Sequence, residues 1–344
     1  MTDQTKRLLS LLLSLGLGAL LLWLALRNAD LGAIADALAD GEWGWMVPFV
    51  GVGLASVALR AWRWGMLIDA LPDRTERTPL LLTSASVAIG YLVNYAAPRL
   101  GEVARTANVS RQADVPFTAV LGTVVAERIL DVIALALALV SVLFLYGDRV
   151  GGIVAQAQET VAGALDVPLW AIGLGVVLVA ALGALGVGLV LRRSGRVGAL
   201  LAQFRDGLAS VTRTGRPGLV VLSTVLLWLS YGLMSDLPFR LLGMDAAYGL
   251  GPVEAWAVMA VGGIGMALPA PGGTGSFHYA TVQALTLLFG VAVTPAATYA
   301  ILVHAAGVVF YCVLGVLAVA LQGASLSALT HSDDGGAEAE AVEA

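Results

Sequence analysis

The sequence predicts an all-α polytopic membrane protein with about eight membrane segments, of which one or two are re-entrant hairpins. Of its 344 residues, 58% are hydrophobic and only 12% are charged, whereas soluble globular domains average about 25% charged residues. Several apolar runs reach the ~20 residues that a helix needs to cross a ~30 Å hydrocarbon core. Within that core the backbone must be helical, because no water is present to satisfy free N–H and C=O groups. We therefore expect a single integral membrane domain over residues 1–330.

Residues 331–344 form a polar tail that contains five of the 24 acidic residues and no Lys or Arg. Without these five acids the chain would have as many acidic as basic residues, so the formal net charge of −5 arises in the tail. A segment with low hydrophobicity and net charge is typically disordered. We expect a disordered tail on the cytoplasmic side.

The N-terminal part predicts two spans joined by an outer loop. The first apolar run, Leu8–Leu26, follows Lys6 and Arg7, which places the N-terminus in the cytoplasm. The next stretch, Asn28–Glu42, carries four acidic residues and no basic one, and suits the outer side. The second span, Trp43–Ala61, ends at basic and aromatic residues that we interpret as a cytoplasmic interfacial anchor. These residues are Arg60, Trp62, Arg63 and Trp64.

Positive charge in the loops predicts a re-entrant hairpin in the next part of the chain. Residues 192–216 contain six arginines and so form a cytoplasmic loop. The span Leu169–Leu191 must then start outside, after an outer loop Gly147–Pro168, and Phe117–Tyr146 must run outwards. The apolar stretch Leu80–Ala97 is therefore flanked by cytoplasmic segments on both sides. We expect it to dip into the membrane and return near Pro98.

The C-terminal half offers few charges for orientation. Gly218–Leu242 is expected to span outwards, and no Asp, Glu, Lys or Arg occurs from Ala255 to Thr330. The Pro- and Gly-rich segment Leu268–Gly275 must break a helix. Either two spans meet there or a second re-entrant hairpin enters from outside, so the orientation of residues 255–296 stays open. Ala297–Leu321 is the last span, and both alternatives leave the C-terminus in the cytoplasm.

A charged cluster lies within the predicted span Phe117–Tyr146. Glu127, Arg128 and Asp131 lie about 15–20 Å along a helix that starts near Phe117, which is close to mid-bilayer. A charge at that depth costs roughly 2.5–3.5 kcal/mol and is a candidate for function. The segment just upstream adds Arg99, Glu102 and Arg105, and the six charges sum to zero. We expect Arg105 to pair with Glu127 or Asp131, and Arg128 with Glu102. Two interpretations stay open: an ion-pair lock for the hairpin, or a polar cavity that receives a charged lipid headgroup.

The Pro- and Gly-rich segment is the second candidate site. It comprises Gly272, Gly273, Thr274 and Gly275, and a new helix should begin at about Ser276 with His278 in its first turn. A helix N-terminus carries free N–H groups and a partial positive charge that suit phosphate or carboxylate. We expect Thr274 and Ser276 to cap this helix. The alternative is a tight packing turn, because glycines also allow helices to approach closely.

Other kinds of site are not predicted. Cys312 is the one cysteine, which excludes an intrachain disulfide and a multi-cysteine metal site. Lys6 is the one lysine and is not part of a Walker A motif. A site made of His278, His304 and His331 is not expected, because His331 lies in the tail; His278 suits a hydrogen-bonding or proton-responsive role. We therefore expect no cofactor, no metal and no catalytic residues.

Four sequence elements together resemble a known family, the lysylphosphatidylglycerol synthase transmembrane-domain family of flippase-like membrane proteins. The elements are Arg60–Trp64, Asn94–Arg105, Glu127–Asp131 and Pro269–Gly275. The resemblance implies an α-helical membrane domain with re-entrant segments that moves lipids between leaflets. It implies that Arg99, Glu102, Arg105, Glu127, Arg128 and Asp131 line or brace the lipid path.

This chain departs from that family pattern in two ways. The soluble aminoacyl-transferring domain of the two-part synthases is not found, so we do not expect the chain to make aminoacyl lipids. Ser276, Phe277 and His278 stand where many relatives have an acidic residue, which argues against a cationic headgroup as substrate.

We interpret the sequence as a lipid transporter or flippase of the cytoplasmic membrane that moves a phospholipid or a polyprenyl lipid without ATP. The partners expected are membrane lipids and not nucleic acid; a homo-oligomer or a complex with a lipid-modifying enzyme is compatible with the sequence. One alternative is a membrane enzyme for polyprenyl-linked sugars, which only the acidic outer residues Asp36, Asp40 and Glu42 favour. Another is a non-transporting partner of a lipid-modifying enzyme.

Overall fold

The computed structural model describes residues 3–72, 74–97, 100–165, 209–268 and 270–322, and in these residues all regular structure is helical. The N-terminal helices are α1 (Asp3–Leu26), α2 (Leu31–Ala39), η1 (Trp43–Trp45), α3 (Met46–Asp69), α4 (Leu80–Ala96), α5 (Gly101–Ala113) and α6 (Phe117–Leu165). The C-terminal helices are α9 (Pro217–Leu241), α10 (Met244–Tyr248), α11 (Pro252–Ala267), η2 (Pro271–Gly273), α12 (Ser276–Gln283), η3 (Ala284–Leu288) and α13 (Val293–Gln322).

Four of the described helical segments are long and apolar enough to cross a membrane. They are Trp43–Asp69, Phe117–Ile153, Pro217–Leu241 and Val293–Gln322. A fifth span results if α1 and α2, which meet at a bend of 82°, are taken together. With the shorter apolar helices α4 and α11, this composition makes the chain a multi-pass membrane protein. The expected span Leu169–Leu191, most of the basic loop after it and the acidic tail lie outside the described residues.

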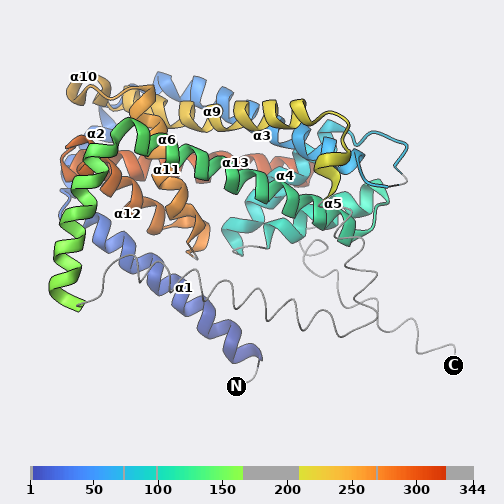
Figure 1. The fold of residues 1–344 in the computed structure, drawn as a ribbon, viewed down its shortest axis with the longest axis horizontal. Helices are drawn as coiled ribbons and strands as arrows, with labels where there is room; N and C mark the ends of the chain where they lie inside the picture. The colour runs from blue at the N-terminus through green and yellow to red at the C-terminus, as the bar shows by residue number, and fades with distance from the viewer. Residues whose placement is uncertain (1–2, 73, 98–99, 166–208, 269, 323–344) are drawn as a thin grey trace.

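The long helices run side by side through the molecule (Figure 1). α3 packs along α9, and α4 packs against both α3 and α13. One apolar core joins α3, α4 and α6 and includes Val57, Ile68, Val87, Val120 and Val124. A second core lies among α9, α11, η3 and α13 and includes Phe239, Leu285 and Tyr299. These are two of the five apolar clusters among the described residues, and the α3–α6 interface lies beside the first of them.

The expected hairpin takes a different form from the one that we predicted. The stretch 80–97 does not turn back on itself, because α4 is continuous from Leu80 to Ala96. The polar helix α5 is the return limb, and it packs closely against α4. Where α4 and α5 approach most closely, each helix has a glycine. A Cβ atom on Gly90 of α4 would lie 3.0 Å from the carbonyl oxygen of Gly101 of α5. The Asn94 side chain accepts a hydrogen bond from the Gly101 N–H at 2.8 Å and so fixes the start of α5.

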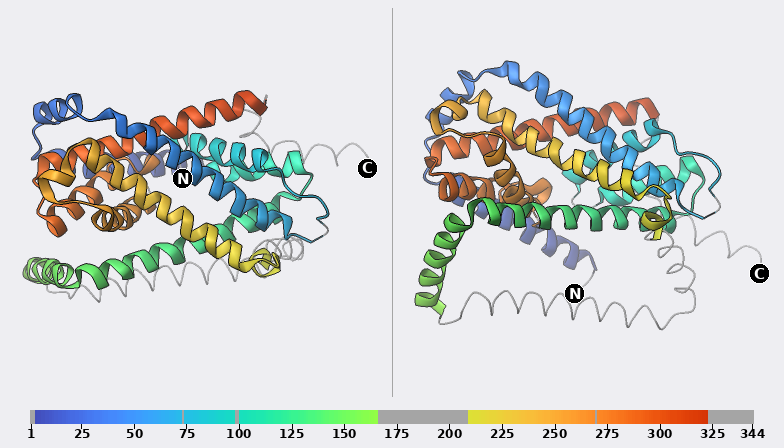
Figure 2. Two further views of the ribbon diagram at one scale, coloured as in Figure 1. Left: turned by 90° about the horizontal axis from the view of Figure 1, so that it is seen from above. Right: turned by 45° about the horizontal axis from the view of Figure 1, so that its top comes forward.

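Helix α6 is longer than the sequence predicted. The helix continues to Leu165 past a kink at Tyr146 (φ −132°), so the expected outer loop Gly147–Pro168 is wrong for residues 147–165. Beyond the kink the helix turns away from the bundle (Figure 2). Glu127, Arg128 and Asp131 precede the kink, whereas Asp148, Arg149 and Glu159 follow it. The helix packs against α3, α5 and α11.

The expected break in the C-terminal half is confirmed. α11 ends at Ala267, η2 covers Pro271–Gly273, and α12 begins at Ser276 and packs against α11. The expected spans Gly218–Leu242 and Ala297–Leu321 correspond to α9 and α13. The α4–α5 break therefore lies beside the first candidate site, and the α11–η2–α12 break contains the second.

Candidate functional site

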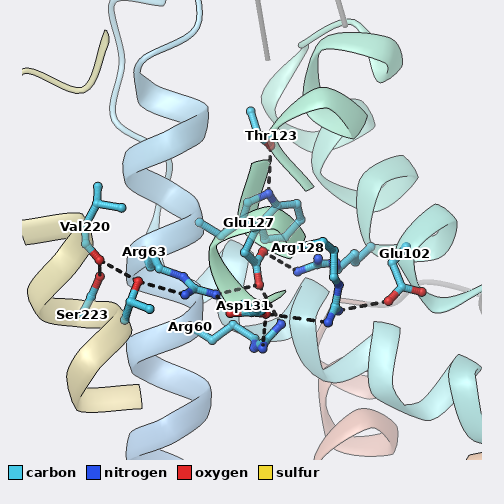
Figure 3. A network of polar contacts seen from close by, with 12 residues as sticks. Arg60, Arg63, Glu102, Thr123, Glu127, Arg128, Asp131, Val220 and Ser223 are labelled. Carbon is cyan, nitrogen blue, oxygen red and sulfur yellow. Dashed lines mark hydrogen bonds and ion pairs between the residues drawn. The ribbon is translucent and has the colours of Figure 1, made fainter. Parts of the chain in front are cut away.

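Glu127 of α6 is the centre of a buried ion-pair network (Figure 3). Its carboxylate is fully buried. One oxygen, Oε1, accepts hydrogen bonds from Arg60 Nη1 at 2.7 Å and from Arg63 Nη2 at 3.4 Å. The other, Oε2, accepts one from Arg105 Nη1 at 2.9 Å. Three guanidinium groups from α3 and α5 thus converge on one carboxylate.

Asp131 lies one helical turn further along α6 and joins the same network. Its Oδ2 accepts a hydrogen bond from Arg60 Nη2 at 2.8 Å, and its Oδ1 accepts one from Arg63 Nη2 at 2.7 Å. Arg128 lies between the two acids in sequence and pairs with Glu102 of α5 at 3.0 Å. The predicted pairs Arg105–Glu127 and Arg128–Glu102 are confirmed.

Arg60 and Arg63 are members of the candidate site that our sequence reasoning missed. We expected them to anchor α3 at the membrane interface together with Trp64, and this expectation is wrong because all three are buried. A basic and aromatic cluster at a helix end is typical of an anchor. The signal against that interpretation was the spacing: residues three apart share one helix face, as Glu127 and Asp131 do at four apart.

Neutral side chains complete the network. Tyr231 and Thr224 of α9 accept hydrogen bonds from Arg60 and Arg63 at 3.1 Å and 3.0 Å. The Arg105 guanidinium lies 4.7 Å from the ring centroid of Trp64, a cation–π geometry. The Trp64 indole in turn donates a hydrogen bond to Thr123. These contacts hold the guanidinium groups of Arg60, Arg63 and Arg105 in place.

The described network has an excess of one positive charge. Its members are Arg60, Arg63, Arg105 and Arg128 against Glu102, Glu127 and Asp131. The neutral sum that we expected is therefore wrong for this network, because two further arginines join it. Arg99, which we had included, lies outside the described residues.

Several guanidinium N–H groups in the network are buried without a hydrogen-bond partner among the described residues. They are Nε of Arg60, Arg63, Arg105 and Arg128, and Nη2 of Arg105. A small recess lies beside them, between α3, α4, α5 and α6. Its lining includes Arg60, Tyr91, Asn94, Glu102, Arg105 and Arg128. The recess is thus polar and basic, and three of the arginines with unpaired N–H groups line it.

The Pro- and Gly-rich turn lies apart from this network. Gly272, Gly273 and Gly275 adopt positive φ angles of 57°, 73° and 85°, which glycine tolerates best. A Cβ atom on Gly275 would overlap the backbone of Gly18, so α1 covers the start of α12. A Cβ atom on Gly272 would lie 2.7 Å from the Tyr95 ring of α4. Tyr95 is one turn from Tyr91, which lines the recess, so α4 connects the two candidate sites.

The expected caps of α12 are wrong. The N-cap residue is Gly275, which has no side chain, and Ser276 donates its hydroxyl to the Gly273 carbonyl oxygen at 3.2 Å. The His278 side chain stabilises the start of α12 instead, because its Nδ1 accepts a hydrogen bond from the Gly275 N–H at 3.3 Å. Its ring packs 4.6 Å from that of His304, which contacts the Thr274 hydroxyl at 3.3 Å. The turn is therefore held by glycine packing and by neutral side chains.

The arrangement suits binding of a charged group more than bond-breaking chemistry. Within the described residues, no group of three or more His, Cys, Asp or Glu side chains could hold a metal ion. Every carboxylate of the network is engaged by at least one arginine. What the network offers to a ligand is positive charge and N–H donors, in a part of the protein surrounded by apolar helices.

Comparison with known proteins identifies the family of the chain. A family model described as the lysylphosphatidylglycerol synthase TM region matches residues 8–315. Neither a curated protein nor a solved structure matches the chain. The matched range covers most of α1 and of α13, every described helix between them, and the α4–α5 and α11–η2–α12 breaks. The chain therefore belongs to the lysylphosphatidylglycerol synthase TM region family.

Proposed function

We propose that this protein moves a phospholipid or another polar lipid between the leaflets of the cytoplasmic membrane without hydrolysing ATP. The observation that carries the proposal is the buried, net-basic network around Glu127 with a recess beside it. A lipid headgroup must cross hydrocarbon to change leaflets, and a polar path through the protein lowers that barrier. Membership of the family supports the same conclusion.

The two helix breaks support the proposal as well. Broken helices at corresponding places in the two halves are typical of midplane transport sites. In this chain α4–α5 lies beside the recess, and α11–η2–α12 contacts α4 through Tyr95 and Gly272. We propose that the full domain has about eight membrane segments with both breaks as re-entrant hairpins, and that both termini are cytoplasmic. Arg99 and the residues from Gly272 to His278 would border the path with the network.

The topology is tested with single cysteines in place of Arg77 before α4 and of Arg111 at the end of α5. Both are expected to react with a membrane-impermeant maleimide only from the cytoplasmic side, in a background in which Cys312 is replaced by Ala. If one of the two reacted from outside, the α4–α5 hairpin would span the membrane and the re-entrant assignment would be lost.

Transport is tested in proteoliposomes with fluorescent phospholipids and dithionite quenching of the outer leaflet. The wild-type protein is expected to speed leaflet exchange over empty liposomes without ATP. Arg105→Gln is expected to slow exchange by about tenfold, because a positive charge is lost from the lining of the recess together with two N–H groups that have no partner among the described residues. Glu127 keeps Arg60 and Arg63, so this variant is expected to fold.

Arg77→Gln is the matched control, because Arg77 is exposed in the loop before α4. Its exchange rate is expected to equal that of the wild type. Exchange no faster than in empty liposomes, for anionic, zwitterionic and polyprenyl lipids and with an imposed proton gradient, would refute transport. The non-transporting partner of a lipid-modifying enzyme would then be the better interpretation.

A further inference from the structure

We propose that the recess binds the mono-anionic phosphodiester of a lipid headgroup, and that the Glu102 carboxylate competes with this phosphate for the same arginines. The inference rests on the proposed function, since it names the class of lipid that the path accepts. It also assigns to Glu102 a role as specificity-determining residue at the mouth of the recess.

The first argument is the set of free donors. Arg105 is 3% exposed and uses only Nη1, on Glu127, so its Nε and Nη2 are buried without a partner among the described residues. Arg60 and Arg128 also line the recess and have free Nε groups. A buried donor that stays unsatisfied is costly. Phosphate oxygens match the planar fork of a guanidinium group and accept bidentate hydrogen bonds from it.

The second argument is the charge of the network. Four described arginines face three described carboxylates, so one negative charge makes the network neutral. A phosphodiester carries one negative charge at neutral pH. A cationic headgroup without phosphate would increase the imbalance. The charge balance of the described network therefore favours an anionic headgroup such as a phosphodiester.

The third argument distinguishes Glu102 from the other two acids. Glu127 is fully buried against three arginines, and Asp131 contacts three. Glu102 has one ion-pair partner, Arg128, and their side chains are 27% and 43% exposed. Exposed ion pairs are weak because water and salt screen them. Glu102 is thus the carboxylate of the network that a phosphate can displace most easily, and it carries the same charge as the ligand.

Binding is measured by native mass spectrometry on the full chain in detergent. The probes are dioleoylphosphatidylglycerol, with one net negative charge, and dioleoylphosphatidylcholine, which is zwitterionic. Dioleoylphosphatidylglycerol is expected to bind the wild type about tenfold more tightly than dioleoylphosphatidylcholine does. Arg105→Gln is expected to weaken that binding by about tenfold or more, and Arg105→Lys by less, because it keeps the charge but not the fork. Glu102→Gln is expected to strengthen it several-fold, and Arg77→Gln to leave it unchanged.

A soluble competitor distinguishes a lipid site from a site for free phosphate esters. Glycerophosphoglycerol has the same headgroup without acyl chains, and it is expected to displace the lipid only at a concentration about a hundredfold higher or more. Displacement at equal concentration would overturn the assignment of a lipid as the ligand.

Two further outcomes would overturn the inference. The first is unchanged phosphatidylglycerol binding in Arg105→Gln, with a melting temperature that shows a folded protein. The second is weaker binding in Glu102→Gln, which would make Glu102 a contact for the lipid and not a competitor. If phosphatidylglycerol bound selectively but the protein gave no leaflet exchange, the proposed transport function would be refuted and the phosphate site would stand. If the rate of leaflet exchange depended neither on the lipid headgroup nor on Arg105, the transport function would stand and the phosphate site would be refuted.

Discussion

The two helix breaks at the candidate sites are stabilised by different means. The α4–α5 break is held beside α6 by arginines and carboxylates, with Glu127 fully buried at the centre. The α11–η2–α12 break lies in a stretch, Ala255–Thr330, that has no acidic or basic residue apart from histidine. There the turn is held by glycines in close contact with neighbouring backbone and by the His278–Gly275 hydrogen bond. The comparison shows that a helix break can be stabilised either by charge pairing or by close packing.

The difference has a consequence for function. Charge pairing leaves N–H groups of Arg60, Arg105 and Arg128 without a partner among the described residues. In our proposal the first break therefore exchanges the Glu102 carboxylate for the phosphate of a lipid. Close packing leaves little room at the second break, where α1 covers the start of α12 at Gly275. The first break is therefore suited to ligand binding, and the second to fixing the helices around it.

The largest effect is expected from removing the central charge of the first break. In Glu127→Gln, Arg105 loses its carboxylate partner and the network gains a further uncompensated positive charge. Stranding a buried charge typically costs about 3–5 kcal/mol, so the free energy of unfolding should fall by about that amount. Denaturant titration in mixed micelles, followed by circular dichroism, measures it. The exposed Glu76→Gln is the control, and equal stability of the two variants would show that Glu127 is not in a buried network.

A smaller effect is expected from filling the close contact of the second break. Gly275→Ala places a Cβ atom against the Gly18 backbone at φ 85°, whereas Gly290→Ala has φ 67° and no atom near its Cβ. The left-handed conformation alone costs roughly 1–2 kcal/mol for alanine, and overpacking adds about 1–3 kcal/mol. The same unfolding titration should therefore find Gly275→Ala less stable than Gly290→Ala by the overpacking part. If the two variants were alike, α1 would not pack on the turn.

The smallest effect is expected at the mouth of the recess. Arg128 is 43% exposed and its pair with Glu102 is screened by solvent, so Arg128→Gln should lower the free energy of unfolding by about 1 kcal/mol or less. The denaturant titration used for Glu127→Gln also measures the free energy of unfolding of Arg128→Gln. A loss as large as that of Glu127→Gln would mean that the outer pair is part of the buried core of the network, and that Glu102 cannot leave Arg128 at low cost.

Much of the helical framework could be predicted from the sequence. α9 and α13 are long apolar runs, and the break at Leu268–Gly275 follows from its prolines and glycines. The pairs Arg105–Glu127 and Arg128–Glu102 followed from charges that cannot remain alone in hydrocarbon. These predictions succeeded because each depends on a local pattern or on a simple balance of charge.

The rest depends on contacts between helices that are distant in the sequence. Arg60 and Arg63 have the composition of an interfacial anchor, and only the packing of α3 against α6 shows that they face Glu127. The helical course of residues 147–165 was hidden by their polar composition. The recess needs four helices and the Gly90–Gly101 crossing, and no single segment contains a signal for it.

The claim that a lipid headgroup enters the α3–α6 recess is tested most directly by crosslinking. Phosphatidylglycerol with a diazirine in its headgroup is incorporated in proteoliposomes with the full chain, photolysed, and the adducts are mapped by peptide mass spectrometry. We expect adducts on recess-lining residues such as Tyr91 and Asn94, and their loss in Arg105→Gln but not in Arg77→Gln. Adducts confined to helix ends and loops, at the same level in both variants, would contradict the account.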